Sequence, residues 1–225
     1  RLPTTLFVLG TAQLLGLLIA LPVGIYSAVR PYSIFDQIAT TFAFIGFSLP
    51  TFFTGLLFIL LFSIYLDWLP FIYRADISAT GWRWVWEMAR QAIMPIAVLG
   101  LFQGAAMTRF VRSAVLEVIK LDYVNTARSK GLSERMTIIK HVVRNALIPV
   151  VTIVALQIPG IFTGAVITEQ IFRVPGIGSL LISAILSNDT PVVMSITFVF
   201  SVLVVFFNLI ADLVYGWLDP RISYR

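Results

Sequence analysis

The sequence predicts an all-α polytopic membrane protein, and composition, hydropathy and the spacing of apolar stretches carry this prediction. The 225 residues are 59% hydrophobic and 12% charged, whereas soluble domains are roughly 45–50% apolar and about 25% charged. The mean hydropathy is +0.94. A soluble protein of this length could not bury so much apolar surface in one core. We therefore expect the bilayer to surround a single transmembrane domain over residues 1–225.

Five apolar stretches are long enough to cross a bilayer, which takes roughly 20 residues. We predict spans at about 4–29, 38–66, 92–110, 146–168 and 192–218. Arg30 and Pro31 close the first stretch, and Asp67 closes the second. Asp219 and Pro220 follow the last. The connecting regions at about 67–90, 109–145 and 169–191 are long enough to carry function.

The distribution of basic residues predicts the orientation. Eight of the 16 Lys and Arg residues lie between 109 and 145, and cytoplasmic loops carry such an excess. Alternation then places the C-terminus in the cytoplasm and the loops 67–90 and 169–191 outside. Four of the five tryptophans fall in 67–90, and Trp favours the membrane interface. Five spans with this orientation put residue 1 outside, so we expect a further N-terminal part with a sixth span.

Composition and motifs argue against several functions for this chain. No cysteine and only one histidine are present, so a thiolate or histidine-built metal site is not expected. No Gly-x-x-x-x-Gly-Lys-Ser/Thr loop occurs, so we expect no ATPase or other enzyme activity and no cofactor here. The net charge of +5 comes from loops of a membrane protein, so we expect no nucleic-acid partner.

The loop 109–145, called the basic loop below, contains residues that typically begin and end two short helices. Asp122 is a plausible N-cap of a helix that runs to Lys130. Gly131 suits the left-handed residue that ends such a helix, and Ser133 can cap a second helix with Glu134 in its first turn. A solvated loop attracted to anionic lipids is the alternative. The helix–Gly–helix pattern favours an element that docks on another protein.

Polar and helix-breaking residues inside the spans indicate close helix packing or a water-filled path. Gln157 with Pro159 and Gly160 predicts a broken helix near the bilayer middle, which suits a cavity or gate. The full set of candidates for the pathway or gate is Ser48, Pro50, Thr51, Gln157, Pro159, Gly160, Asn208 and Asp212. The region 169–191 is too apolar for an ordinary loop, and a helix lying on the membrane surface is the simplest interpretation.

Several segments resemble the permease subunits of binding-protein-dependent ABC importers, and in particular their dipeptide/oligopeptide branch. The loop carries DYVNTARSKGLS at 122–133, followed by IKHVVRNALIPVVT at 139–152. The resemblance continues through GAVITEQIF at 164–172, PGIG at 175–178, DTPVV at 189–193 and DLVYGWLDPRI at 212–222. It covers essentially the whole chain.

The loop departs from the general pattern of that superfamily at two points. The pattern begins Glu-Ala-Ala, whereas this chain has Asn125-Thr126-Ala127 at the corresponding spacing from Gly131. Val143-Arg144 stands where the pattern has Leu-Pro. A role of the missing carboxylate therefore does not transfer to this chain.

The resemblance implies a type I ABC importer permease fold in a bacterial inner membrane. It implies a second related permease in a heterodimer, two ATP-binding subunits that hold ATP and Mg²⁺, and an extracytoplasmic substrate-binding protein. It further implies that the loop couples to the ATPase, with Arg128 and Lys130 pairing with acids there. The coupling residues would be Asp122, Tyr123, Ala127, Arg128, Lys130, Gly131 and Leu132. For the region 169–191 it implies a re-entrant or extracytoplasmic helix near the mouth of the pore, in contact with the docked binding protein. The residues facing the binding protein would be Glu169, Phe172, Pro175 and Gly176.

Peptides are the expected substrate, with a nickel chelate or glutathione as alternatives in the same family. A secondary transporter driven by an ion gradient is the alternative of another class. Such proteins usually carry inverted repeats and many have ionisable residues at mid-membrane. Neither is evident in this sequence.

Overall fold

The computed structural model describes residues 1–74, 80–163 and 165–218, and every regular element among them is helical. The chain begins with two helices, α1 (Leu2–Val29) and α2 (Ile34–Ser48). The remaining elements are α3 (Thr51–Phe58), a π-helix (Ile59–Tyr65), α4 (Trp82–Val118), α5 (Asp122–Ser129), α6 (Glu134–Met136), a second π-helix (Thr137–Val143), α7 (Arg144–Thr163), α8 (Val166–Ile171), α9 (Ile177–Leu186) and α10 (Thr190–Leu218).

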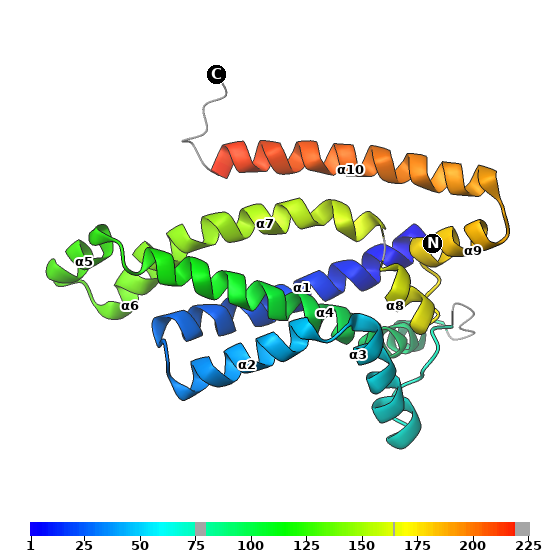
Figure 1. Cartoon of the computed structure of the whole chain (residues 1–225), viewed down its shortest axis with the longest axis horizontal. Helices are drawn as coiled ribbons and strands as arrows, with labels where there is room; N and C mark the ends of the chain where they lie inside the picture. The colour runs from blue at the N-terminus through cyan, green and yellow to red at the C-terminus, as the bar shows by residue number, and fades with distance from the viewer. Residues whose placement is uncertain (75–79, 164, 219–225) are drawn as a thin grey trace.

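The long helices lie side by side along the longest axis of the molecule (Figure 1). The connection between α1 and α2 lies toward one end, together with α5 and α6. The N-terminus, α8 and α9 gather at the other end. The elements of the basic loop and those of the region 169–191 therefore lie at opposite ends of the bundle, as the predicted topology requires.

Within the part of the chain that the structure describes, four helical stretches are long and apolar enough to cross a membrane: Leu2–Val29, Trp82–Val118, Glu134–Ile161 and Thr190–Ile210. The pair Ile34–Ser48 and Thr51–Tyr65 gives a fifth if it counts as one span. Helix α4 extends beyond the span predicted at 92–110 at both ends. The stretch that includes α7 begins at Glu134, well before the predicted residue 146, because charged helical turns precede the apolar segment, and α7 ends at Thr163 and not at 168. Polar residues end an apolar stretch without ending a helix.

The stretch predicted as the second span, 38–66, is divided by a bend of 101°. Leu49 is extended, with φ −81° and ψ 128°, and Pro50 precedes the first residue of α3. A proline disfavours helical backbone in the residue before it, which explains the break. In Figure 1, α3 projects sideways from the bundle.

Small residues allow α1 and α4 to form the most extensive helix pair of the molecule. Every fourth position of α1 is small and buried along one stripe, which consists of Ala12, Gly16, Ala20, Gly24 and Ala28. A Cβ on Gly16 would lie 3.1 Å from the backbone nitrogen of Gly104 in α4, and a Cβ on Gly104 would lie 3.2 Å from the Gly16 carbonyl oxygen. Small residues at this spacing allow membrane helices to pack backbone against backbone.

Two clusters of buried apolar side chains lie on either side of this contact. One includes Val8, Met94 and Phe172, near the end that carries α8 and α9. The other includes Val111, Val124, Val142 and Ala146, and it joins α4 and α7 to the basic loop. Much of the remaining apolar surface is exposed, as for Leu18, Phe198 and Leu213. Exposed apolar area on this scale fits lipid or further protein.

Candidate functional site

The basic loop folds as the predicted helix, glycine turn and second helix. After α5, the backbone N–H of Gly131 donates to the Arg128 carbonyl oxygen at 2.9 Å. Gly131 has φ +79°, the left-handed conformation expected for it. The Ser133 hydroxyl accepts a hydrogen bond from the backbone N–H of Met136, so Ser133 caps the second helix. That helix continues without a break into α7.

The start of α5 differs from the prediction in one residue. Leu121 is the N-cap, and Asp122 is the first residue of the helix, with no side-chain hydrogen bond that caps it. The carboxylate of Asp122 lies in the first turn, where the helix dipole favours negative charge. The prediction of Asp122 as N-cap is therefore wrong, although its charge still suits the position.

Arg128 pairs within the loop. Its Nη2 lies 2.8 Å from Oε1 of Glu134 and its Nε lies 3.0 Å from Oε2, and Nη1 reaches the side-chain oxygen of Asn125. These hydrogen bonds lower the pKa of the Glu134 carboxyl below its ordinary value. Arg128 thus ties α5 to α6 across the glycine turn. Lys130 is exposed and has no ion pair within the part of the chain described by the structure.

The inner face of α5 packs on the chain's own second π-helix. Val124 is fully buried and Ala127 is 6% exposed. The Tyr123 hydroxyl donates to the His141 carbonyl oxygen at 3.2 Å. Ala127, one of the predicted coupling residues, is therefore buried against this chain and is not available for packing on a partner. Tyr123 and Leu132 remain 40% and 37% exposed, so they are available for such packing.

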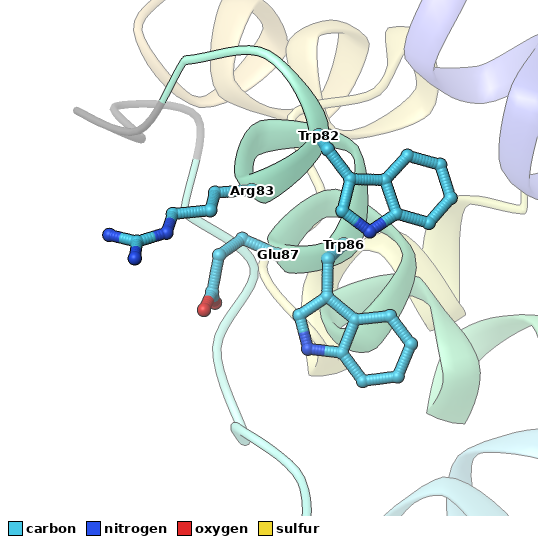
Figure 2. Close-up of a pocket in the computed structure, with 4 residues that line it drawn as sticks. All are labelled: Trp82, Arg83, Trp86 and Glu87. Carbon is cyan, nitrogen blue, oxygen red and sulfur yellow. The ribbon is translucent and has the colours of Figure 1, made fainter.

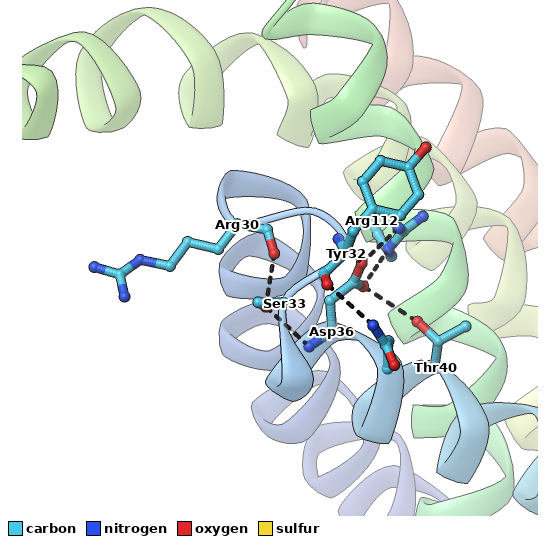
Figure 3. A network of polar contacts seen from close by, with 7 residues as sticks. Arg30, Tyr32, Ser33, Asp36, Thr40 and Arg112 are labelled. Atoms are coloured by element: carbon cyan, nitrogen blue, oxygen red, sulfur yellow. Dashed lines mark hydrogen bonds and ion pairs between the residues drawn. The ribbon is translucent and has the colours of Figure 1, made fainter.

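A salt bridge that the sequence analysis missed fixes the same end of the bundle. Asp36 of α2 is 2% exposed, and its two carboxylate oxygens accept hydrogen bonds from Nε and Nη2 of Arg112 in α4, at 2.6 and 2.8 Å. The backbone N–H of Tyr32 and the Thr40 hydroxyl also donate to Asp36. Figure 3 shows the carboxylate enclosed by these groups. The two partners are 76 residues apart, so no local pattern reveals the pair.

Replacing Arg112 by Ala should lower the stability of the permease by about 2–4 kcal/mol, because a buried carboxylate loses its bidentate partner. Thermal unfolding of the purified complex should start at a lower temperature. The unfolding temperature of the Arg112→Lys complex should lie between those of the unmodified and the Arg112→Ala complexes, since Lys keeps the charge but not the planar guanidinium. Arg30→Ala serves as the control, because Arg30 is exposed at the same end. Equal unfolding of the Arg112→Ala and Arg30→Ala proteins would contradict the role of the pair.

The pathway candidates are distributed over three helical regions, and the structure does not gather them into one site. Gln157 of α7 accepts a hydrogen bond from Gln13 of α1 at 3.0 Å, and Pro159 is buried inside α7. Because α7 runs without interruption through Gly160, the prediction of a broken helix at this point is wrong. Ser48, Pro50 and Thr51 form the bend between α2 and α3. The other three are Gly160, which is exposed in α7, and Asn208 and Asp212, which are exposed on α10. Their roles remain predictions.

The residues expected to contact a binding protein are mostly internal. Glu169 is 1% exposed, Phe172 is 2% exposed and Gly176 is buried, while Pro175 is half-buried. In this structure they do not form an exposed contact surface, because the turn between α8 and α9 folds around Glu169. The region 169–191 holds the end of α8 and all of α9, which corrects the expectation of one helix there. A location on the membrane surface stays a prediction.

Another feature near this end is a hollow of about 560 Å³ at the start of α4. It is lined by Trp82, Arg83, Trp86 and Glu87. In Figure 2 the two indoles lie above one another on one side, and Arg83 and Glu87 extend on the other. Exposed tryptophans with polar neighbours suit a membrane interface, as the sequence predicts for 67–90.

Comparison with known proteins gives consistent matches over the chain. Residues 20–224 match the family described as binding-protein-dependent transport system inner membrane component. The oligopeptide transport system permease protein AppB of Bacillus subtilis is 41% identical over 225 residues, which are 100% of this chain and 70% of that protein. The dipeptide transport system permease protein DppB of Escherichia coli is 35% identical over 95% of this chain and 69% of its own length.

Two further matches bear on substrate and fold. The glutathione transport system permease protein GsiC of Salmonella choleraesuis is 34% identical over 100% of this chain and 70% of its own length. Among solved structures, an inward-facing form of the MetNI methionine ABC transporter contains a chain of the same fold, with a TM-score of 0.71 and 17% identity. The match covers 97% of this chain and 94% of that one.

Proposed function

Since the chain belongs to the family of binding-protein-dependent transport system inner membrane components and is the permease subunit of an ABC importer, we propose that its substrate is a short peptide. The observation that carries this proposal is the identity of 41% with an oligopeptide permease over the full length of this chain. Membership of this family also sets aside the ion-gradient-driven transporter considered from the sequence. A nickel chelate has no support among these relatives.

Glutathione is the second candidate, because a glutathione permease is 34% identical over the whole chain. Glutathione is itself a tripeptide with an unusual first peptide bond. The two candidates therefore differ in the shape of the substrate near its N-terminus. In this type of importer a separate binding protein would make that distinction.

The exposed side of the basic loop is where an ATP-binding subunit would dock. Val124 and Ala127 pack α5 against the second π-helix of this chain, and the ion pair of Arg128 with Glu134 fixes the glycine turn. Among the predicted coupling residues, the exposed ones are Asp122, Tyr123, Lys130, Gly131 and Leu132. Of these, Lys130 is a cation free to pair with an acidic partner. A rigid element anchored on α7 in this way can pass a displacement to the membrane helices.

We further infer an assembly of this chain with a second, related permease, two ATP-binding subunits that hold ATP and Mg²⁺, and an extracytoplasmic binding protein. The C-terminus would lie in the cytoplasm. The exposed apolar side chains of α10 and of α3 offer surface for the second permease or for lipid.

The test is uptake by the complete importer in proteoliposomes, with a labelled tripeptide and labelled glutathione as probes. We expect uptake of the tripeptide to require ATP and to persist when an ionophore collapses ion gradients. Faster uptake of glutathione than of the tripeptide would replace the first proposal by the second. Uptake that needs no ATP would contradict both.

A further inference from the structure

Glu169 of α8 is buried without a cation. It is 1% exposed, and no ion pair of the described residues includes it. Its Oε1 accepts a hydrogen bond from the Thr5 hydroxyl at 2.8 Å, and its Oε2 accepts one from the backbone N–H of Ser179 at 2.7 Å. A carboxylate inside a membrane protein is costly unless it is fully hydrogen-bonded. Here neutral donors from two other helices satisfy it.

These contacts join α1, α8 and α9. Ser179 lies in the first turn of α9, where backbone N–H groups have no partner within the helix and the dipole favours an anion. Thr5 belongs to α1, and its hydroxyl oxygen also accepts the backbone N–H of Ile177 at 2.8 Å. Two free donors of α9 are thus satisfied by Glu169 and Thr5. Thr5 is completely buried between the partners that it links.

The turn before α9 is shaped to the carboxylate. A Cβ on Gly176 would overlap the carboxylate of Glu169, and a Cβ on Gly178 would lie 2.9 Å from its Oε2. The backbone N–H of Val174 donates to the Glu169 carbonyl oxygen at 2.8 Å. The Ser179 hydroxyl donates to the carbonyl oxygens of Val174 and Gly176. Only glycine allows the chain to pass so close to the side chain at 176.

The contacts among Thr5, Glu169, Gly176 and Ser179 lie at the end of the bundle opposite α5, where α8 and α9 adjoin the N-terminus of α1 (Figure 1). Phe172, at the end of α8, packs toward α3, and a Cβ on Gly55 would lie 3.3 Å from its ring. The group formed by Thr5, Glu169, Gly176 and Ser179 therefore sits where several helices meet at the outer end. Moving α9 away from α1 would break the hydrogen bonds of Thr5 and leave the buried carboxylate of Glu169 with too few donors.

We propose that Glu169 is a positioning residue, whose carboxylate joins α1, α8 and α9 into one rigid unit at the outer end of the translocation pathway. In an importer that alternates between two conformations, α9 then moves together with α1 and does not separate from it. The proposal rests on the proposed function only for its consequence for uptake. The unit itself can be tested without any substrate.

The first experiment measures how accessible α9 is in the purified complete importer. The chain has no cysteine, so Ala184→Cys places a single thiol of this subunit at a position that is 5% exposed. Glu169→Ala should increase the rate of maleimide labelling at that thiol by about tenfold or more, because local opening becomes easier. Thr5→Val should act in the same direction with less change of shape.

Two controls make this result specific. Gln170→Ala changes the exposed neighbour on α8 and should leave the labelling rate unchanged. Glu169→Gln keeps the shape and one acceptor oxygen, so its effect should be smaller than that of Ala. Equal rates for Glu169→Ala, Thr5→Val and Gln170→Ala would overturn the proposal.

The second experiment asks whether α9 moves with α1 during transport. The double change Thr5→Cys and Ile177→Cys, joined by a short thiol cross-linker, replaces the hydrogen bonds by a covalent link. We expect the cross-linked importer to retain uptake. It should also regain the uptake that the Thr5→Cys change alone loses. Loss of uptake on cross-linking would show that α9 must leave α1. If the unmodified importer takes up no peptide, the substrate proposal fails while the labelling result still stands.

Discussion

Gly131→Val is expected to separate ATP hydrolysis from substrate uptake. Gly131 has φ +79°, and no atom lies within 4 Å of the position that a Cβ would take. The penalty therefore comes from backbone conformation, and for a β-branched residue it is about 1–3 kcal/mol. We expect uptake to fall about tenfold or more while the complex still hydrolyses ATP. The ratio of ATP hydrolysed to substrate imported in proteoliposomes measures the effect.

Gly131→Asn is the matched control for this prediction. Asn tolerates the left-handed region far better than Val does, and the open space accepts its side chain. Uptake by the Asn variant should therefore stay near that of the unmodified protein. If the Val variant keeps the same ratio as well, the turn does not act as a coupling element.

Gly16→Leu is expected to prevent α1 from packing on α4. The new side chain would meet the backbone of Gly104 and Gly100, at 3.1 and 3.2 Å from its Cβ. Backbone cannot rotate away as a side chain can, so the cost should exceed the roughly 1–3 kcal/mol of ordinary overpacking. We expect little or no monodisperse complex in size-exclusion chromatography. Gly10→Leu changes the same helix where nothing lies within 4 Å, and it should leave assembly intact.

A smaller side chain at position 16 tests whether the effect on assembly depends on side-chain size. Gly16→Ala adds only the Cβ, so the helices must separate by a few tenths of an ångström. It should give complex that assembles but unfolds at a lower temperature. Assembly of the Leu variant at the level of Gly10→Leu would mean that α1 and α4 do not depend on this close approach.

The sequence predicted those features whose causes are local. The all-helical class, the left-handed Gly131 and the Ser133 cap follow from composition and from residues a few positions apart, and the structure confirms all three. The importer fold implied by the resemblance is confirmed by the match to the methionine transporter chain. The small-residue stripe of α1 is also a local pattern, because it repeats every four residues, although it was not among the predictions.

The features that escaped prediction depend on distant parts of the chain. From the sequence alone, Glu169 is an acidic residue of a predicted outer loop. Its buried position depends on Thr5, which is 164 residues away in the sequence and donates a hydrogen bond to it. Ala127 lies on a short helix, and the sequence does not tell whether its apolar face meets this chain or a partner. Pro50 indicates an interruption, but the bend of 101° depends on the packing of α3 against α8.

The length of α4 has a mechanical consequence. Its 37 residues extend over about 55 Å, whereas the hydrocarbon core of a bilayer is about 30 Å thick. A tilt of about 10° around its middle would therefore displace each end by about 5 Å, in opposite directions. One end leads into α5, and the other carries the exposed Trp82, Trp84 and Trp86. In the proposed assembly, a displacement of the end of α4 next to α5 would thus shift its opposite end without bending any helix.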